Sequence, residues 1–552
     1  MTEKTNHCWW QNAVGYQIYP KSFYDTNGDG IGDIDGIIAK LPYLKDLGID
    51  FIWLNPIYPS PNVDNGYDIS DFKDVAAPFG DLTRLKTLLD KAHALGIKVL
   101  MDLVINHTSD QHPWFIEAKK SKDNPYRDYY HWVDCSKKEL PNDWKSFFGG
   151  SVWEYDSVSE QAYFHLFYKE QPDLNWHNPQ MRQEIYEMIR FWLKFGIDGF
   201  RLDAISHLEK APWDTKIVDN PWAPFMNVSG IEVYMQELKA IFDEYQILTV
   251  GEASGVTSKK AREWTDISTG YLTMIFELEH NIRVGHVGHQ RIDVRGFKQV
   301  LARWQKDLMD VGWNALYVEN HDNPRINSVL GNETEKSAKA IAMMYLGLKG
   351  TPFIYQGQEL GMVNFPFKTI DEMDDLSDKA RFKQLIAAGS TPKAALKEVS
   401  WYSRDNARVP VSWENKANSG FTSGVPWLDV RPNCSRINVA DEAVDPNSVL
   451  NFYKRLIALR KSKRIFSQGD FRLLLAGDEN VFSYLRSNKN EQLFILVNLS
   501  GQKVNITLPN RVINHHWQCI VSNTQSINLM RHIELKGYDG FIFERIDKKS
   551  SS

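Results

Sequence analysis

The stretch that decides the fold runs from IDFIWLNP (49–56) through LTRLKTLLDKAHALG (82–96) to IKVLMDLVINH (97–107). The first and last segments are apolar runs of strand length, and the middle one carries apolar residues at helical spacing. Gly96 ends the middle segment, as a glycine C-cap does before a strand. A buried strand, a helix and a second buried strand predict a βαβ unit of a parallel sheet.

The same alternation continues in both directions along the chain. Six further strand-like runs are AVGYQIYP (13–20), IDGFRLDAI (197–205), ILTVGEA (247–253), TMIFELE (273–279), NALYVENHD (314–322) and TPFIYQGQE (351–359). Eight parallel strands close into a barrel, so we expect an α/β fold of the (β/α)8 TIM type. An open, doubly wound sheet is the alternative. The number of units and the absence of a Gly-rich dinucleotide fingerprint disfavour it.

Two regions break this rhythm. Residues 108–178 are rich in Asp, Lys, Trp, Tyr and Pro and have no clear helical period, which predicts an irregular insert domain after the third strand. From residue 468, short strand candidates follow one another without helices, which predicts an antiparallel C-terminal β-sandwich over 468–552. The catalytic barrel is then expected over 1–107 and 179–467.

The overall composition is that of a soluble globular protein. It is 43% hydrophobic and 24% charged, with a formal charge of -6, which gives no reason to expect nucleic acid or a membrane as partner. The four cysteines are far apart and argue against a disulfide framework or a zinc site. No apolar stretch has the length of a signal peptide core or a membrane span, so we expect a cytoplasmic protein, monomeric or weakly homo-oligomeric.

Three carboxylates end three of the predicted strands: Asp203, Glu252 and Asp322. Strand C-terminal ends carry the active site in this fold, and Arg201, His107 and His321 lie at the same ends. Structural ion pairs, with Arg201 balancing Asp203, are the alternative for any one carboxylate. Three on one rim favour catalysis. Two carboxylates around a glycosidic bond are the arrangement for glycoside hydrolysis, with retention when they lie about 5–5.5 Å apart.

Several motifs make the chain recognisable as a whole. The segments DLVINH, GFRLDAI, TVGEA and ENHDNPR, in that order, resemble the conserved regions of the α-amylase superfamily, glycoside hydrolase family 13. Five more, DNGYDISD (64–71), SFFGGSVWEY (146–155), HDNPR (321–325), YQGQELGM (355–362) and SRDNARVPVSW (403–413), resemble its oligo-1,6-glucosidase branch. The branch includes α-glucosidases, dextran glucosidases, trehalose-6-phosphate hydrolases and sucrose isomerases.

The resemblance implies a role for each matching residue. Asp203 matches the nucleophile, Glu252 the acid/base, and Asp322 the third carboxylate, which holds the 2- and 3-hydroxyls of the reacting sugar. The matching substrate-binding residues are His107 and His321 as donors to those hydroxyls, Arg201 beside the nucleophile, Asp64 with Arg408 around the non-reducing end, Tyr67 as the stacking aromatic and Phe148 as a pocket wall. Arg404 competes with Arg408 for its role, and core packing is the alternative for Tyr67 and Phe148.

A polar loop, DTNGDGIGD (25–33), has the alternating oxygen ligands of a calcium site. The expected ligands are Asp25, Asn27, Asp29, Asp33 and the Ile31 carbonyl. Position twelve is Gly36 instead of the bidentate Glu of an EF-hand. Members of the resembled branch carry a metal on this loop, so we expect a structural calcium ion and no organic cofactor. A polar turn is the alternative.

The expected activity is that of a retaining, exo-acting α-glucosidase on short α-glucosides. Val usually follows the nucleophile in α-1,6-preferring members of the branch, and Ala204 stands there in this chain, so we expect α-1,4 or other non-1,6 linkages. An oligo-1,6-glucosidase is the alternative. The segment HQRIDVRGF (289–297) disfavours a sucrose isomerase, and nothing marks a phosphate pocket for trehalose 6-phosphate. A non-catalytic, transporter-associated protein is remote, because the three carboxylates are present and a membrane helix is not.

Overall fold

The structure is a computed structural model that describes residues 8–280, 292–430 and 436–546. Eight strands form a closed parallel barrel in the order β1-β11-β10-β9-β8-β7-β3-β2. They are β1 (Gly15–Ile18), β2 (Phe51–Leu54), β3 (Lys98–Val104), β7 (Gly199–Asp203), β8 (Leu248–Glu252), β9 (Met274–Phe276), β10 (Asn314–Leu316) and β11 (Thr351–Tyr355). Each lies within one of the eight predicted runs. The predicted (β/α)8 barrel is therefore confirmed, and the open sheet is excluded.

The chain divides into two compact units. The first unit comprises Met1–Gly32, Ala39–Phe51 and Glu279–Ser552, and the second comprises Asp33–Ile38 and Ile52–Leu278. In the first unit, β11 pairs with β1 and with β10. In the second unit, β7 pairs with β3 and β8, and β8 pairs with β9. These units do not follow the predicted domain boundaries, which stay predictions.

The barrel strands are mainly apolar because helices cover a parallel sheet. In the second unit these helices are α2 (Leu82–Ala94), α4 (Pro179–Phe195), α5 (Ile231–Tyr245) and α6 (Ala261–Thr265). The sequence sets the ends of α4: Asn178 accepts hydrogen bonds from the Gln180 and Met181 amides, and Gly196 ends the helix at a φ of 116°. Its buried face includes Ile185 and Trp192, as the helical period predicts.

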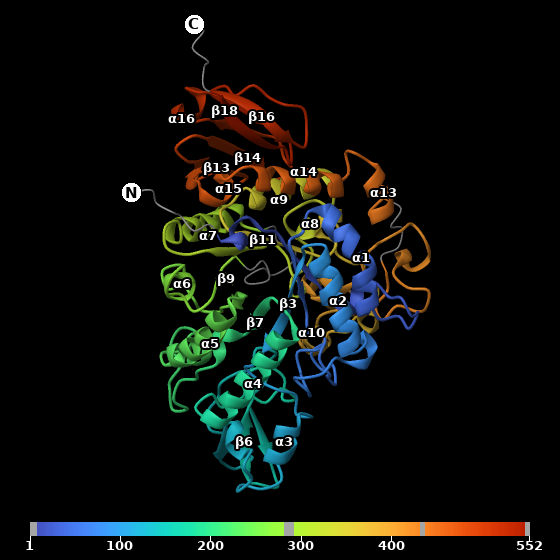
Figure 1. Cartoon of the computed structure of the whole chain (residues 1–552), viewed down its shortest axis with the longest axis vertical. Helices are drawn as coiled ribbons and strands as arrows, with labels where there is room; N and C mark the ends of the chain where they lie inside the picture. The colour runs from blue at the N-terminus through green and yellow to red at the C-terminus, as the bar shows by residue number, and fades with distance from the viewer. Residues whose placement is uncertain (1–7, 281–291, 431–435, 547–552) are drawn as a thin grey trace. The chain divides into compact units, whose positions relative to one another are not determined.

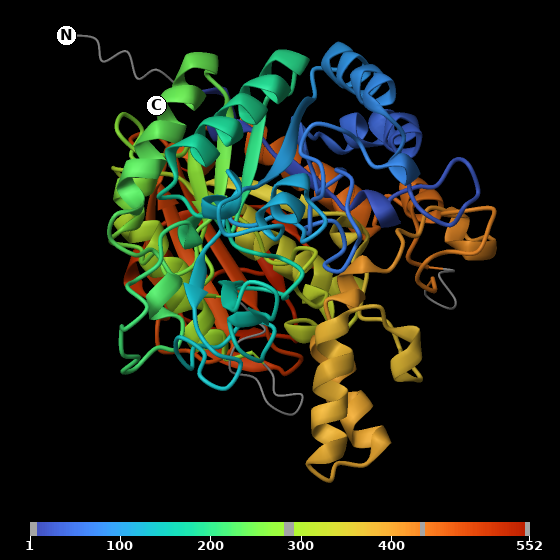
Figure 2. The same cartoon turned by 90° about the horizontal axis from the view of Figure 1, so that it is seen from below.

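The first unit holds the later helices of the barrel. They are α7 (Val294–Asp307), α8 (Ile326–Val329), α9 (Glu335–Leu346), α10 (Leu376–Ala387), α11 (Pro392–Tyr402), α12 (Asp405–Arg408), α13 (Val439–Val444), α14 (Val449–Ser462) and α15 (Ile465–Gln468). One more helix, α1 (Ile34–Leu47), includes residues of both units. Among them, α10 and α11 form a helical hairpin that Figure 2 shows side by side. Arg381 of α10 contacts Glu398 of α11 at 2.9 Å.

The insert after β3 is more regular than its sequence indicates. It contains α3 (Pro113–Ala118) and a three-stranded antiparallel sheet of β4 (Trp132–Asp134), β6 (Gln161–Phe164) and β5 (Trp153–Asp156), in that order. Strands of three or four residues are too short to show a period of two in the sequence. Packing of aromatic residues such as Trp153 and Phe164 holds the sheet together instead.

The C-terminal region is antiparallel, as predicted. Its five-stranded sheet is formed by β12 (Asp470–Leu474), β13 (Val481–Ser487), β14 (Gln492–Asn498), β18 (Gly540–Ile546) and β16 (His516–Ser522) (Figure 1). A second, two-stranded sheet pairs β15 (Val504–Thr507) with β17 (His532–Leu535), and α16 (Asn510–Ile513) follows β15. Phe494 of the large sheet and Ile533 of the small one belong to the same apolar core.

Across the described ranges, none of the helices combines the length and apolar character that crossing a bilayer requires.

Candidate active site

Arg201 lies at the centre of the first group of candidate residues. Arg201 and Asp203 are two residues apart on β7, so their side chains share a face, and Glu252 ends the neighbouring strand β8. Arg201 Nη1 donates to Asp203 Oδ1 at 2.6 Å, and Nη2 donates to Glu252 Oε2 at 2.8 Å. One guanidinium therefore brings the predicted nucleophile and the predicted acid/base side by side.

A third carboxylate in this group, Asp102 of β3, was not assigned a role from the sequence. It accepts hydrogen bonds from Arg201 Nη1 at 2.9 Å, Trp53 Nε1 at 3.1 Å and the Tyr67 hydroxyl at 3.0 Å. The Asp102 side chain is completely buried, whereas the Glu252 side chain is 25% exposed. Asp102 thus holds Arg201 from the buried side, while the partly exposed Glu252 is accessible to a ligand. Its signal in the sequence is a charged residue within the apolar run VLMDLV.

The negative charges of this group favour the binding of a proton. Burial raises the pKa of Asp203 well above its usual range, and the negative charges of Glu252 and Asp102 add to this, while Arg201 opposes it. One cation among three carboxylates cannot neutralise them all. The raised pKa of Asp203 therefore favours one protonated carboxyl beside the guanidinium that it shares with Glu252. One protonated and one ionised carboxylate are what a retaining glycosidase requires.

His107, Asp64 and Tyr67 form a hydrogen-bonded layer beside this group. His107 Nε2 lies 3.1 Å from the Tyr67 carbonyl oxygen and 3.1 Å from Gln171 Nε2. Gln171 also donates to Asp64 Oδ2 at 3.2 Å, so it joins two predicted residues. Burial lowers the pKa of His107 to about 4, although Asp173 opposes the effect, so the imidazole is neutral at pH 7. Gln171 was missed because it lies in the insert, which has no periodicity to mark it.

Two further predicted features lie in the second unit. Phe148 stacks on Tyr168, with ring centroids 4.2 Å apart, which accounts for one face of its ring. Ala204, the residue after Asp203, is only 3% exposed and has a left-handed backbone with φ 45°. Its amide donates to Glu252 Oε2 at 3.3 Å. The backbone at Ala204 therefore helps to orient Glu252, the predicted acid/base.

The other group of candidates, in the first unit, is built around Asp322, which follows β10. His321 Nε2 lies 3.1 Å from Asp322 Oδ2, and the other ring nitrogen of His321 lies 2.8 Å from Gln17 Nε2. Arg404 Nη1 and Arg408 Nη2 both donate to Asp322 Oδ1, at 3.3 and 3.2 Å. Both competing arginines thus contact the same carboxylate. The predicted pairing of Arg408 with Asp64 stays a prediction.

The predicted calcium loop is held by hydrogen bonds of its own side chains. Asp25 accepts from the amides of Asn27, Gly28 and Gly30 at 2.8–2.9 Å, and Thr422 also donates to it. Asp29 accepts from the Ile31 amide at 2.8 Å, and Asp33 accepts from that of Gly36 at 2.6 Å. Within the described ranges, no three His, Cys, Asp or Glu side chains are gathered around a possible metal position. The oxygen-only donor set nevertheless fits calcium in type.

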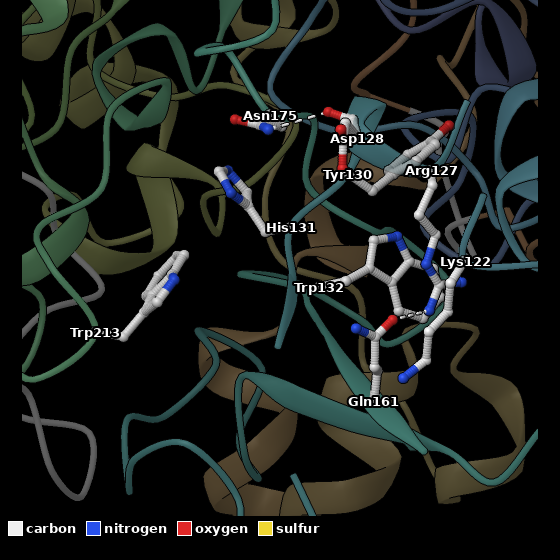
Figure 3. A pocket seen from close by; sticks show the side chains of 9 residues that line it. All are labelled: Lys122, Arg127, Asp128, Tyr130, His131, Trp132, Gln161, Asn175 and Trp213. Carbon is white, nitrogen blue, oxygen red and sulfur yellow. Dashed lines mark hydrogen bonds between the residues drawn. The ribbon is translucent and has the colours of Figure 1, made fainter. Parts of the chain in front are cut away.

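A cavity of about 230 Å³ is lined by residues of the insert and by Trp213 (Figure 3). None of the predicted site residues lines it. Arg127 lies over the Trp132 ring at 3.4 Å and donates to the Ala118 carbonyl at 2.8 Å and to Gln161. The guanidinium therefore serves the packing of the insert.

The closed parallel barrel and the paired carboxylates at its strand ends define a glycoside hydrolase. The chain belongs to the α-amylase family: the model of the α-amylase catalytic domain matches residues 17–469, and that of the maltogenic amylase C-terminal domain matches residues 471–542. The resemblance drawn from the motifs is thereby confirmed.

Within this family, the chain is similar over nearly its whole length to several individual proteins. The oligo-1,6-glucosidase of Parageobacillus thermoglucosidasius is 44% identical over 97% of this chain and 99% of its own. Among solved structures, a variant of the trehalose-6-phosphate hydrolase of Bacillus licheniformis matches with a TM-score of 0.94 at 38% identity, over 98% of this chain and 100% of its own. The isomaltulose synthase of Klebsiella matches with a TM-score of 0.92 at 38% identity, over the same shares. The segment 289–297, which disfavoured isomerisation, lies partly outside the described residues.

Proposed function

We propose that this chain is a retaining, exo-acting α-glucosidase that releases glucose from the non-reducing end of short α-1,6-linked glucosides. The observation that carries the proposal is the Arg201 guanidinium, whose two terminal nitrogens hold Asp203 and Glu252. Two adjacent carboxylates with one proton to share suit double displacement.

In the proposed reaction, the ionised Asp203 carboxylate attacks the anomeric carbon of the terminal glucose. The glycosidic oxygen leaves with a proton from Glu252, and a covalent glucosyl–Asp203 ester remains. Water then gives a proton to Glu252 and attacks the same carbon, which releases glucose and regenerates both side chains. The contact of Arg201 with Asp203 favours the ionised form of the nucleophile, and the partial exposure of Glu252 suits the group that meets leaving sugar and water.

The linkage in this proposal differs from the one that Ala204 predicted. The oligo-1,6-glucosidase at 44% identity supports the 1,6 alternative over an α-1,4 preference. Ala204 is buried and its backbone amide is bound to Glu252, so the size of its side chain is weak evidence about a neighbouring sugar. The trehalose-6-phosphate hydrolase and the isomaltulose synthase have the same fold, so the fold alone does not select the substrate.

A structural calcium ion on the 25–33 loop is a second part of the proposal. The loop supplies carboxylate, amide and carbonyl oxygens at alternating positions. Asn27 Oδ1 and Asp29 Oδ1 each accept one amide hydrogen bond, which leaves a further lone pair on each for a cation. A cytoplasmic location and a monomeric or weakly oligomeric state stay predictions from the sequence.

The purified enzyme should release glucose from isomaltose with a higher kcat/KM than from maltose. The test is a coupled glucose assay on both disaccharides, with Asp203→Asn as the control because it keeps the size of the side chain and removes its charge. Activity on both sugars with maltose preferred would overturn the linkage. Glucose release that persisted in the Asp203→Asn variant would contradict the assignment of Asp203 as the nucleophile.

A further inference from the structure

A second carboxylate, Asp375, lies behind Asp322 and shares both of its arginines. Asp375 Oδ2 accepts from Arg404 Nε and from Arg408 Nη1, the latter at 3.4 Å. The same guanidiniums reach Asp322 Oδ1 through other nitrogens. Each arginine therefore bridges the two carboxylates, and moving Asp375 would move both of the arginines that donate to Asp322.

Asp322 and Asp375 differ in solvent exposure, so they cannot have the same function. The Asp375 side chain is completely buried, while the Asp322 side chain is 21% exposed. A sugar can reach Asp322 but not Asp375. Arg408 is also buried, so its position depends on the groups packed around it.

Of Asp375, Asp378 and Asp405, which lie near the two arginines, Asp375 is the one whose pKa is lowered. Burial alone would raise its pKa, but Arg404 and Arg408 outweigh burial and hold the pKa well below the usual range. Burial raises the pKa of neighbouring Asp378 to about 8, and the charge of Asp375 adds to this. Burial also raises the pKa of Asp405. Asp375 therefore places a negative charge within hydrogen-bond distance of both arginines.

Asp375 is itself fixed to the base of the α10–α11 hairpin. Its Oδ1 accepts from the Ser377 amide at 2.8 Å and so caps α10, while Oδ2 faces the arginines. Asp405, at the start of α12, accepts from the amides of Asp374 and Asp375 at 2.7 and 3.0 Å. The two ends of the hairpin are thus joined next to the arginine pair.

We propose that Asp375 is a positioning residue, which holds Arg404 and Arg408 in the geometry that orients Asp322 toward the sugar hydroxyls. The inference rests on the proposed function, in which Asp322 is the third carboxylate. The alternative hypothesis is that Asp375 only stabilises α10 as its N-cap. The two readings differ in kinetics: a positioning role lowers kcat in fully folded protein, and a cap does not.

The variants separate the two roles of Asp375. Asp375→Ser keeps a good N-cap but has no charge to hold the arginines, and Asp375→Asn keeps the volume as well. Thr391→Ala is the matched control, because Thr391 caps α11 of the same hairpin through the Ala394 amide and bonds no arginine among the described residues. Folding of each variant is checked by circular dichroism and thermal unfolding.

We expect kcat on isomaltose to fall about 10²-fold in Asp375→Ser and Asp375→Asn, since small misplacements of catalytic groups cost about this much. KM should change far less, because Asp322 acts mainly on the transition state. Thr391→Ala should keep its kcat. The proposal fails if a folded Asp375 variant, Ser or Asn, keeps the wild-type kcat or loses no more than Thr391→Ala. A wild type inactive on all α-glucosides would overturn the proposed function and this inference together, whereas an active wild type with active Asp375 variants would overturn only the inference.

Discussion

At the scale of single residues, burial determines which groups titrate. His112 is 5% exposed, and its Nδ1 accepts the Trp114 amide at the start of α3. Burial lowers the pKa of His112 to about 3. Protonation would both charge a buried ring and break the cap, so the neutral form is the one that the fold requires.

This residue makes stability depend on pH in a definite direction. The folded pKa is below the ordinary value, so the unfolded chain binds the proton first as the pH falls, and stability that is present above about pH 6.5 is lost toward about pH 3. Asn in place of His112 keeps a capping oxygen and removes the titration. When the pH is lowered from about 7.5 to about 5, the free energy of unfolding of His112→Asn should rise by about 2 kcal/mol relative to that of wild type. Chemical denaturation at both pH values measures this. A difference between the two proteins that does not vary with pH would contradict it.

The residues predicted to bind the sugar are easier to find in the sequence than the residues that hold them in place. Asp203 and Glu252 end apolar strands and Asp322 follows the strand β10, and a charge at such a position stands out in the sequence. Gln171 lies in the aperiodic insert, and Asp375 looks like an ordinary N-cap before a polar helix. Their roles come from contacts across a hundred or about thirty residues of chain, which no local pattern records.

At the scale of elements, the 25–33 loop is the one whose function is open to a direct test. Calcium at about 100 times its Kd would stabilise the folded state by about 2.7 kcal/mol. We therefore expect a chelator to lower the temperature of unfolding and added calcium to restore it, with no such response in Asp29→Ala. Asp266→Ala is the control, because Asp266 makes similar turn hydrogen bonds with Ser268 and Thr269. An unfolding temperature that is indifferent to chelator and calcium would contradict a structural ion.

Elements also differ in how well the sequence predicts them. Long amphipathic helices with cap signals, such as α4, follow directly from period and termini. The three-residue strand β4 does not, because side-chain packing rather than pattern stabilises it.

At the scale of the whole molecule, the barrel could be predicted because its strands are buried on both faces and appear as eight mainly apolar runs. The linkage preference could not be predicted from one position. Ala204 is buried and held by its backbone, so a substitution there changes little surface that a sugar could touch.

The most direct test of the account is to trap the glucosyl-enzyme with a slow-reacting fluorinated α-glucosyl fluoride and locate the label by mass spectrometry. A retaining mechanism with Asp203 as nucleophile predicts a covalent sugar on the peptide that contains Asp203. The label should be absent from the Asp203→Asn variant. A label on Glu252, or turnover that releases β-glucose first without any covalent adduct, would contradict the assignment of the two carboxylates.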